Sequence, residues 1–480
     1  MKHPGENYLI ADGIASWIMA TLTGNPFLVT IALYYGASNF VIGLLAAIPP
    51  ALQLLQIPSI YLVEYYRRRR PICVSSSVIA RTLVLFIAIL PWLFHDRHTA
   101  LIFLVLAIAV QSAFGAISVC SWNSWMRDFL PQDKMGSIYS RRLSWAFLIS
   151  TILNISTGFF LDHFEKFHIR SEIHAYSVIY FVGFLAGISG LFFLSRIPEP
   201  PMVEQKLPLH LTKIILEPFK QPNFRNLIIF LGAWNFAVFL AAPFFTVYML
   251  KMLGLSMSAV IGFTVISQIA NFASFRLWGS FCDRFSNKTV LSVNGPLFIF
   301  CIFAWTFTRH GFTIPLLIVI HSLMGIATAG ITLSTQNIAL KLAPREKATG
   351  YLAANSMITS LASGLAPLLG GLFADFFSKR QLVWSVKWTS PDENVVLRIL
   401  DFSSWDFFFF IAFAIGLYSL HRLAYVQESG EVKEKIVLDE ILFLARREMR
   451  NISSVGGLRN MSQLPLNFVR YVTKPKRTKK

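Results

Sequence analysis

Long apolar runs alternate with short polar stretches along most of the chain. Each run has about the 20 residues that an α-helix needs to cross the hydrocarbon of a bilayer. Twelve such runs lie near residues 9–34, 39–63, 72–95, 99–123, 144–164, 175–195, 225–250, 257–278, 289–309, 313–340, 348–377 and 403–424. The pattern predicts an all-α polytopic membrane protein with 12 transmembrane helices.

This pattern occurs twice in the chain. Lys134 and Lys347 are 213 residues apart, and Asp162 and Asp375 keep the same separation. At separations of 217 to 219, the matching residues of the two copies are Trp17 and Trp234, Pro26 and Pro243, Gly43 and Gly262, and Glu64 and Asp283. One period that spans six helices indicates two parallel six-helix bundles. We predict these bundles at 1–196 and 225–425, joined by a Pro-rich, charged linker at 197–224.

Composition and charge support a membrane protein over a nucleic-acid-binding one. Hydrophobic residues make up 55% of the chain and charged residues only 14%, whereas soluble proteins carry charge on about a quarter of their residues. The net charge of +18 is concentrated in alternate connections and in the tail. Before the tail, twenty Lys and Arg lie in these connections against nine on the opposite side. The positive-inside rule therefore predicts that both termini lie in the cytoplasm, and we expect the protein in the inner (cytoplasmic) membrane.

The polar stretch GSFCDRFSNK, at 279–288, connects the eighth and ninth runs. It places Gly279, the pair Asp283–Arg284 and Lys288 four residues apart, and Glu64 marks a degraded first copy in IYLVEYYRRRR. This stretch resembles the cytoplasmic-loop signature of the major facilitator superfamily, as does the arrangement of helices over residues 8–425. The resemblance implies that the glycine allows close helix approach, that the acidic residue meets a helix N-terminus of the other bundle, and that the loop is part of a gate.

The resemblance implies a secondary transporter that moves a small organic solute by alternating access, with proton coupling as one option. The run SWNSWMRDFLPQDKMG resembles a loop of bacterial permeases with undefined substrates. Export of drugs or lipids is the alternative, although the fourth run has Gln111 and no arginine, and the fifth run has no Gly-Pro. A membrane-embedded enzyme would need a nucleophile–base cluster, and a channel would not need duplicated gate loops. We expect no catalytic residues and no cofactor. We also expect no metal site, because the four cysteines lack CxxC spacing.

Ionisable residues inside a membrane span are costly and commonly functional. Asp12 and Arg81 lie in the cytoplasmic halves of the first and third runs. One interpretation is a structural pair that removes an unpaired charge from lipid. In the other, Asp12 is a proton-coupling carboxylate or Arg81 contacts an anion.

Polar residues on the predicted first, fourth, seventh and tenth helices are candidates for substrate contact, because these helices line the central cavity in this architecture. They are Trp17, Asn25, Gln111, Asn235, His321 and Gln336. Trp17 offers a stacking surface, the amides donate and accept hydrogen bonds, and His321 is expected to titrate near neutral pH. The alternative for each of them is an interhelical hydrogen bond.

Two segments go beyond twelve helices. Residues 378–402 alternate around TSPDE, which predicts an extracytoplasmic β-hairpin, with an unstructured loop as the alternative. The tail, 426–480, contains EKIVLDEILFLARREMR and ends on KPKRTKK. A basic amphipathic helix of this kind is typical of binding to anionic headgroups, and a partner-protein site is the alternative. We expect a monomer with a small-molecule substrate and no nucleic-acid partner.

Overall fold

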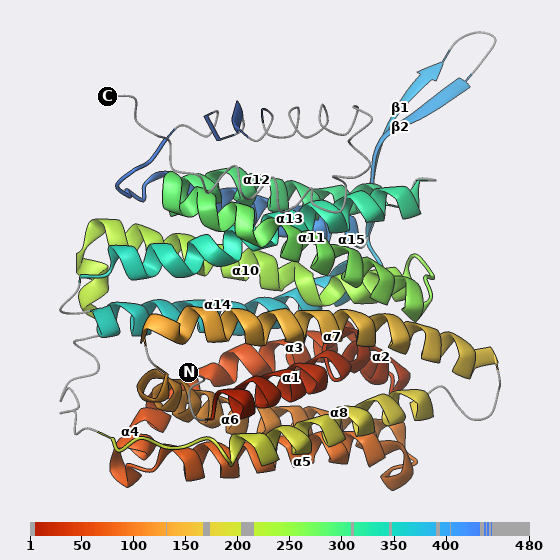
Figure 1. Cartoon of the computed structure of the whole chain (residues 1–480). Helices are drawn as coiled ribbons and strands as arrows, with labels where there is room; N and C mark the ends of the chain where they lie inside the picture. Colours follow the sequence, from red (N-terminus) through yellow and green to blue (C-terminus); the bar gives the residue numbers. More distant parts are fainter. Residues whose placement is uncertain are drawn as a thin grey trace, which may run out of the picture. The chain divides into compact units, whose positions relative to one another are not determined.

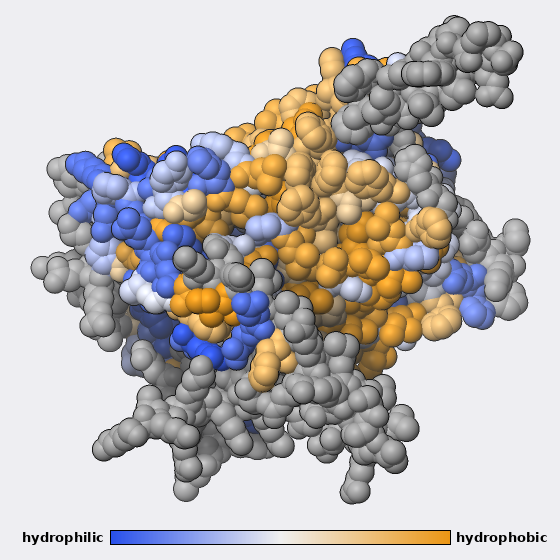
Figure 2. Space-filling model, turned by 90° about the horizontal axis from the view of Figure 1, so that it is seen from above, coloured by the Kyte–Doolittle hydropathy of each residue, from blue (hydrophilic) through white to orange (hydrophobic). Residues whose placement is uncertain are grey.

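The computed structural model describes most of the chain. The described residues are 5–130, 132–166, 173–202, 216–308, 312–344, 348–389, 394–403, 405–432, 436, 437, 439, 440 and 443. Within them, 12 helices are long and apolar enough to cross a membrane, and they coincide with the twelve apolar runs. Figure 2 shows hydrophobic residues across the middle of the visible face and hydrophilic residues toward its two ends. The prediction of an all-α, multi-pass membrane protein is confirmed.

Most of the structure consists of long helices (Figure 1). Those of the first half are α1 Glu6–Leu22, α2 Asn25–Tyr34, α3 Asn39–Leu52, η1 Gln53–Leu55, α4 Gln56–Tyr66, α5 Arg69–Leu93, α6 Arg97–Phe129, α7 Gln132–Lys166 and α8 Ile173–Leu194. Those of the second half are η2 Glu217–Lys220, α10 Pro222–Lys251, α11 Met257–Arg284, α12 Asn287–Ala304, η3 Trp305–Phe307, α13 Thr313–Leu342, α14 Ala348–Phe377 and α15 Trp405–Ala424.

The predicted hairpin between the last two spans is present. Strand β1, Gln381–Thr389, pairs with β2, Asn394–Ser403, in an antiparallel register that joins Gln381 to Ser403 and Thr389 to Asn394. A register shift between Trp384 and Ser385 interrupts the ladder. The turn residues 390–393 lie outside the described residues.

The chain forms two compact units. Unit 1 comprises residues 1–209, 239–265 and 360–408, and unit 2 comprises 210–238, 266–359 and 409–480. The boundaries cut α10, α11, α14 and α15, so unit 1 contains the whole first half together with parts of these four helices and the hairpin of the second half. The division into bundles at 1–196 and 225–425 stays a prediction.

Within unit 1, α3 and α14 are packed backbone against backbone through glycines. A Cβ at Gly43 would collide with the Pro367 carbonyl oxygen, and one at Gly371 would lie 2.5 Å from the Asn39 carbonyl oxygen. Asp375 closes the contact: its carboxylate accepts hydrogen bonds from the Phe40 N–H at 2.9 Å and from the Asn39 side-chain amide at 2.9 Å. The carboxylate thus satisfies free N–H groups at the start of α3.

The first two spans are interrupted near their middles, which the apolar pattern did not predict. The first span breaks between α1 and α2, where Gly24 is extended and Pro26 stands in the first turn of α2. Proline has no N–H to donate, and the position suits it because the first turn has no intrahelical acceptor. The Tyr180 hydroxyl donates a hydrogen bond to the Thr23 carbonyl at 3.3 Å. The second span narrows to the 3₁₀ turn η1 after Pro49 and Pro50.

Unit 2 has an aromatic core at one end of its helices. Trp278 and Phe281 of α11 pack with Val290 of α12 and with Val437, which is fully buried although it follows the last span. The beginning of the predicted tail therefore packs against protein. The greater part of the predicted amphipathic helix, and all of KPKRTKK, lie outside the described residues.

Candidate functional site

A cluster of charged side chains is buried between the helices of unit 1, within the membrane spans. The Asp12 side chain on α1 is only 4% exposed, and its Oδ1 lies 3.6 Å from Nη2 of Arg81 on α5. The Ser16 hydroxyl donates to the same oxygen at 3.3 Å. Arg81 also donates to the Gly187 carbonyl of α8 and, at 3.0 Å, to the Ser16 hydroxyl. The predicted pairing of Asp12 with Arg81 is therefore present.

A third charge belongs to the cluster and was not predicted. Nη2 of Arg142, on α7, lies 3.7 Å from Asp12 Oδ2, and its guanidinium lies 4.9 Å from the ring centroid of Trp122 on α6. Sequence reasoning placed Arg142 in a cytoplasmic connection because a basic, polar stretch precedes it. Its helix begins ten residues earlier, at Gln132, and carries the side chain into the unit. The cluster thus joins five helices.

Three glycines provide the space for these side chains. A Cβ at Gly13 would collide with the Arg142 side chain, and one at Gly190 would lie 2.8 Å from Arg81 Nη1 and 3.4 Å from Asp12 Oδ1. At Gly187 it would lie 3.4 Å from Arg81 Cδ. Close backbone approach is what glycine permits and other residues prevent. The sequence signals that could have located the site are Gly13 beside Asp12 and two glycines one helical turn apart on α8.

One face of α1 and the start of α2 remains exposed at membrane depth. α1 packs against α7 and α8, and Thr21 donates to the Ser150 hydroxyl of α7 at 2.9 Å. Trp17 is 45% exposed, and Asn25 is exposed at the first position of α2. Lipid does not accept an exposed amide readily. Trp17 and Asn25 are thus exposed side chains on the same membrane span as the buried Asp12.

The remaining candidates for substrate contact differ in exposure. Gln111 on α6 is half-buried. In unit 2, Gln336 on α13 is exposed, Asn235 donates to the Leu231 carbonyl of its own helix at 2.8 Å, and half-buried His321 stands edge-on to Trp305 with ring centroids 5.6 Å apart. The Asn235 bond stays within its own helix, so the interhelical hydrogen bond that was the alternative for this set stays a prediction.

The signature residues lie at the end of α11 and the start of α12. Asp283 is exposed, Arg284 pairs with Glu440 at 2.9 Å, and Lys288 pairs with Glu431 at 2.9 Å. A Cβ at Gly279 would meet Leu333 at an ordinary 3.8 Å, so the packing inside unit 2 does not require a glycine there. Glu64, in the degraded copy, is half-buried near the end of α4. Its predicted place in a gate, like that of Asp283, stays a prediction.

Two carboxylates that sequence reasoning did not single out bind equivalent helix starts. Glu199, after α8, accepts from the Arg69 N–H of α5 at 2.5 Å. Glu428, after α15, accepts from the Lys288 N–H of α12 at 2.7 Å. Each follows the last helix of its half and holds the N-terminus of the third, where the helix dipole favours negative charge. The available signal was a glutamate four residues beyond the last apolar run of each half.

An ion pair accompanies each of these two helix starts, and the charge on the neighbouring helix is negative in unit 1 and positive in unit 2. In unit 1, Arg69 binds Asp128, near the end of α6. In unit 2, Glu428 binds Lys341, near the end of α13, at 2.9 Å, and Lys341 stands 213 residues after Asp128. Burial by itself raises the pKa of Glu428, but hydrogen bonds from Lys341, the Lys288 N–H and Asn287 outweigh it and hold this pKa below its ordinary value.

Comparison with known proteins identifies the family. The model of the Major Facilitator Superfamily matches residues 13–367 and 263–455. The chain belongs to the Major Facilitator Superfamily. It is accordingly a multi-pass membrane protein and a secondary transporter of small solutes, from a family of transporters rather than of enzymes.

Solved transporters of the superfamily share the fold at low sequence identity. A mutant of the nucleoside transporter NupG superposes with a TM-score of 0.64 at 13% identity, covering 88% of this chain and 100% of that one. A bacterial homologue of the iron transporter ferroportin, in an inward-facing state, gives 0.62 at 11%, covering 88% and 99%. A bacterial homologue of the lysosomal transporter Spinster, inward-facing and occupied, gives 0.58 at 15%, covering 93% and 98%. A search of curated protein sequences gives no significant match.

Proposed function

We propose that the transported solute is a small organic molecule that contacts the exposed face formed by Trp17 and Asn25, and that Asp12 couples its transport to protons. The observation that carries the proposal is the combination in one membrane span of exposed side chains, Trp17 and Asn25, and a buried carboxylate held between two arginines. Trp17 provides a stacking surface, and Asn25 provides a donor and an acceptor. A solute with a planar, polar group suits this pair.

The coupling role rests on what a proton at Asp12 would change. The deprotonated carboxylate attracts Arg81 and Arg142 from two other helices. Protonation removes that attraction and leaves two like charges in a site of low polarity, which weakens the link between α1, α5 and α7. A carboxylate that fastens helices in one protonation state and releases them in the other can couple proton movement to rearrangement of the bundle.

The other predicted residues keep subordinate roles in the proposal. Gln111, Asn235, His321 and Gln336 are further solute contacts on their respective helices. Asp283, Arg284, Gly279, Lys288 and Glu64 are parts of the cytoplasmic gate. The protein is a monomer without catalytic activity in the cytoplasmic membrane, with both termini in the cytoplasm and its basic tail on anionic lipid headgroups.

The contact between α3, from the first half of the chain, and α14, from the second half, lies within unit 1 and supports transport by alternating access. Glycine packing and the Asp375 cap close these helices onto each other near the hairpin, and transport by rocking would require that contact to open. A disulfide between cysteines at 39 and 375 should therefore stop uptake, and reduction should restore it. Uptake at the normal rate through the oxidised double variant would contradict this mechanism.

The solute can be found by a thermal-shift screen of metabolites on the purified protein, since a ligand of the native state raises its melting temperature. Uptake of each hit into proteoliposomes then tests transport. Trp17→Ala and Asn25→Ala should each lower uptake at least about tenfold. Ser189→Ala is the matched control, because Ser189 is exposed at membrane depth and its hydroxyl bonds only its own helix, at the Ala186 carbonyl. Normal uptake by both variants would end the assignment of this face.

The coupling role has a separate readout. Asp12→Asn should abolish uptake driven by a pH gradient while leaving exchange of labelled for unlabelled solute, because exchange needs no net proton movement. Retention of gradient-driven uptake would exclude Asp12 as the coupling group.

A further inference from the structure

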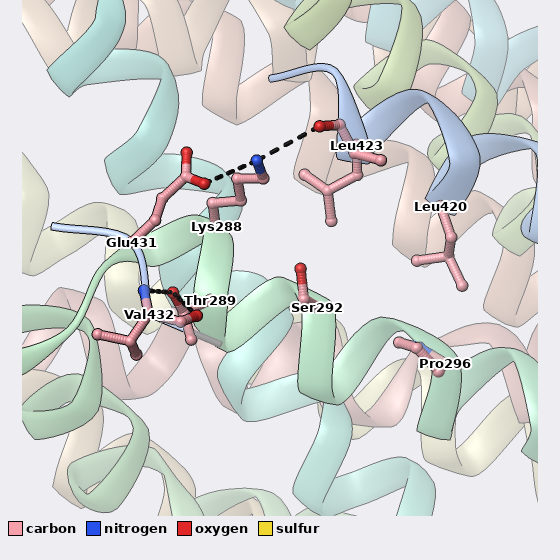
Figure 3. A pocket seen from close by; sticks show the side chains of 9 residues that line it. Lys288, Thr289, Ser292, Pro296, Leu420, Leu423, Glu431 and Val432 are labelled. Atoms are coloured by element: carbon pink, nitrogen blue, oxygen red, sulfur yellow. Dashed lines mark hydrogen bonds and ion pairs between the residues drawn. The ribbon is translucent and has the colours of Figure 1, made fainter. Parts of the chain in front are cut away.

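A cavity of about 350 Å³ opens where the first turns of α12 meet the end of α15. Lys288, Thr289, Ser292 and Pro296 line it from α12, and Leu420, Leu423 and Ala424 from α15. Glu431 and Val432, beyond the last span, close its outer end (Figure 3). The start of one membrane span and the end of another meet there, so the cavity lies at the boundary between headgroups and hydrocarbon.

The polarity of the lining changes in order along the cavity. Glu431 lies outside the spans and Lys288 in the first turn of α12. Ser292, whose hydroxyl points into the space between Lys288 and the α15 leucines (Figure 3), is about 6 Å deeper at 1.5 Å per residue, and Pro296 is about 12 Å deeper. The interfacial layer is roughly 5–8 Å thick on each side of the hydrocarbon. From Glu431 along α12, the lining thus passes from anion to cation to hydroxyl within that layer and becomes apolar beneath it, while the α15 side is apolar throughout.

We propose that this cavity binds a phospholipid whose headgroup ends in a primary ammonium, as in phosphatidylethanolamine. From its outer end inward, such a lipid presents ammonium, phosphate, glycerol esters and acyl chains. These groups match Glu431, Lys288, Ser292 and the apolar pair Pro296 and Leu420 in the same order. The site is separate from the solute-contact face and does not depend on the transport mechanism.

The hydrogen bonds at the outer end select among headgroups. The Lys288 ammonium lies 2.9 Å from Glu431 Oε2 and 3.4 Å from the Ala424 carbonyl oxygen, so the mouth carries no net charge. The Glu431 carboxylate has about four acceptor positions, and among the described residues it accepts from Lys288 and from the Glu428 N–H. A primary ammonium can donate to the rest. A trimethylammonium head has no N–H, and a glycerol head has no positive charge.

Lipid retention by the purified full-length protein tests the proposal. The protein is equilibrated in micelles with equal amounts of dioleoyl phosphatidylethanolamine, phosphatidylcholine and phosphatidylglycerol, and bound lipid is counted by native mass spectrometry. We expect about tenfold preferential retention of phosphatidylethanolamine, the factor that one charge-assisted hydrogen bond provides. Equal or stronger retention of either other lipid would overturn the choice of headgroup.

Two variants locate the site and one controls for charge. Glu431→Gln should lower the preference for phosphatidylethanolamine about tenfold, and Ser292→Leu should remove lipid retention by filling the cavity. Glu440→Gln removes a carboxylate paired with Arg284 in the same unit but outside the cavity, and should retain lipid as the unmodified protein does. Gel filtration shows whether Ser292→Leu folds. If it does not, the test rests on Glu431→Gln alone, and an unchanged lipid preference in that variant would overturn the proposal.

Discussion

Replacing Asp12 by Asn should destabilise the protein more than replacing either arginine that contacts it. The carboxylate has two partners, Arg81 at 3.6 Å and Arg142 at 3.7 Å. Asp12→Asn leaves both guanidiniums without their shared counter-charge. Arg81→Gln leaves Asp12 with Arg142 and with the Ser16 hydroxyl. The asymmetry follows from the connectivity of the cluster.

The expected cost comes from the burial of the partners. The side chains of Asp12 and Arg81 are 4% and 8% exposed, and removing one member of a buried ion pair typically costs about 3–5 kcal/mol. For Arg81→Gln we expect about 1–3 kcal/mol, because lost hydrogen bonds are the main term. The double variant Asp12→Asn/Arg81→Gln should cost less than the sum of the two by about 0.5–3 kcal/mol, as neighbours in one network do.

Equilibrium unfolding in mixed micelles, followed by tryptophan fluorescence, measures these differences. The matched control is Arg127→Gln. Arg127 is 60% exposed and pairs with Asp128 at 3.4 Å, and exposed pairs contribute about 0–1 kcal/mol. A variant that does not refold is compared by its melting temperature at one fixed scan rate.

Two results would refute the reasoning. One is an equal cost for Asp12→Asn and Arg81→Gln, which would mean that Arg142 does not share the carboxylate. The other is a cost of Asp12→Asn no greater than that of Arg127→Gln, which would mean that the cluster is accessible to water in the native state.

Three further predictions concern acid stability, topology and gating. The lowered pKa of Glu428 means that its bonds stabilise the protein above the carboxyl pKa of the unfolded chain and that this contribution disappears as pH falls through the lower folded-state value. Glu428→Gln should therefore flatten the loss of melting temperature in acid, and an unchanged profile would contradict the role of this cluster. Cysteines at Ser137 and Ser390 should react with an impermeant thiol reagent from opposite faces of the membrane. Three of the four native cysteines are buried, so background should be low, and labelling of both sites from outside would exclude the proposed topology. Asp283→Asn should alter uptake severalfold while the melting temperature stays within about 2 °C, the range of most surface substitutions, and a large stability loss with normal uptake would exclude a gating role.

Much of the fold could be predicted from the sequence because lipid allows few solutions. A backbone in hydrocarbon must satisfy its own hydrogen bonds, so a run of 20 apolar residues forms a helix almost regardless of its neighbours. The same solvent argument gave the Asp12–Arg81 pair as one of two interpretations, since a lone charge at that depth is too costly. Alternation of side chains also predicted the β1–β2 hairpin, where pairing is local in the chain.

The tertiary structure decided what depends on partners distant in sequence. The break at Gly24 is stabilised by a hydrogen bond from the Tyr180 hydroxyl of another helix. Hydropathy cannot predict that contact. Arg142 belonged by composition to a basic connection, and only the path of α7 over Gly13 brings it to Asp12. In the sequence, Glu199 and Glu428 are ordinary residues of the linker and the tail. Only the folded chain brings a helix N-terminus against each of them. Hydropathy along a chain measures transfer from water to lipid one residue at a time, whereas the partner of a charge is set by which helices pack together.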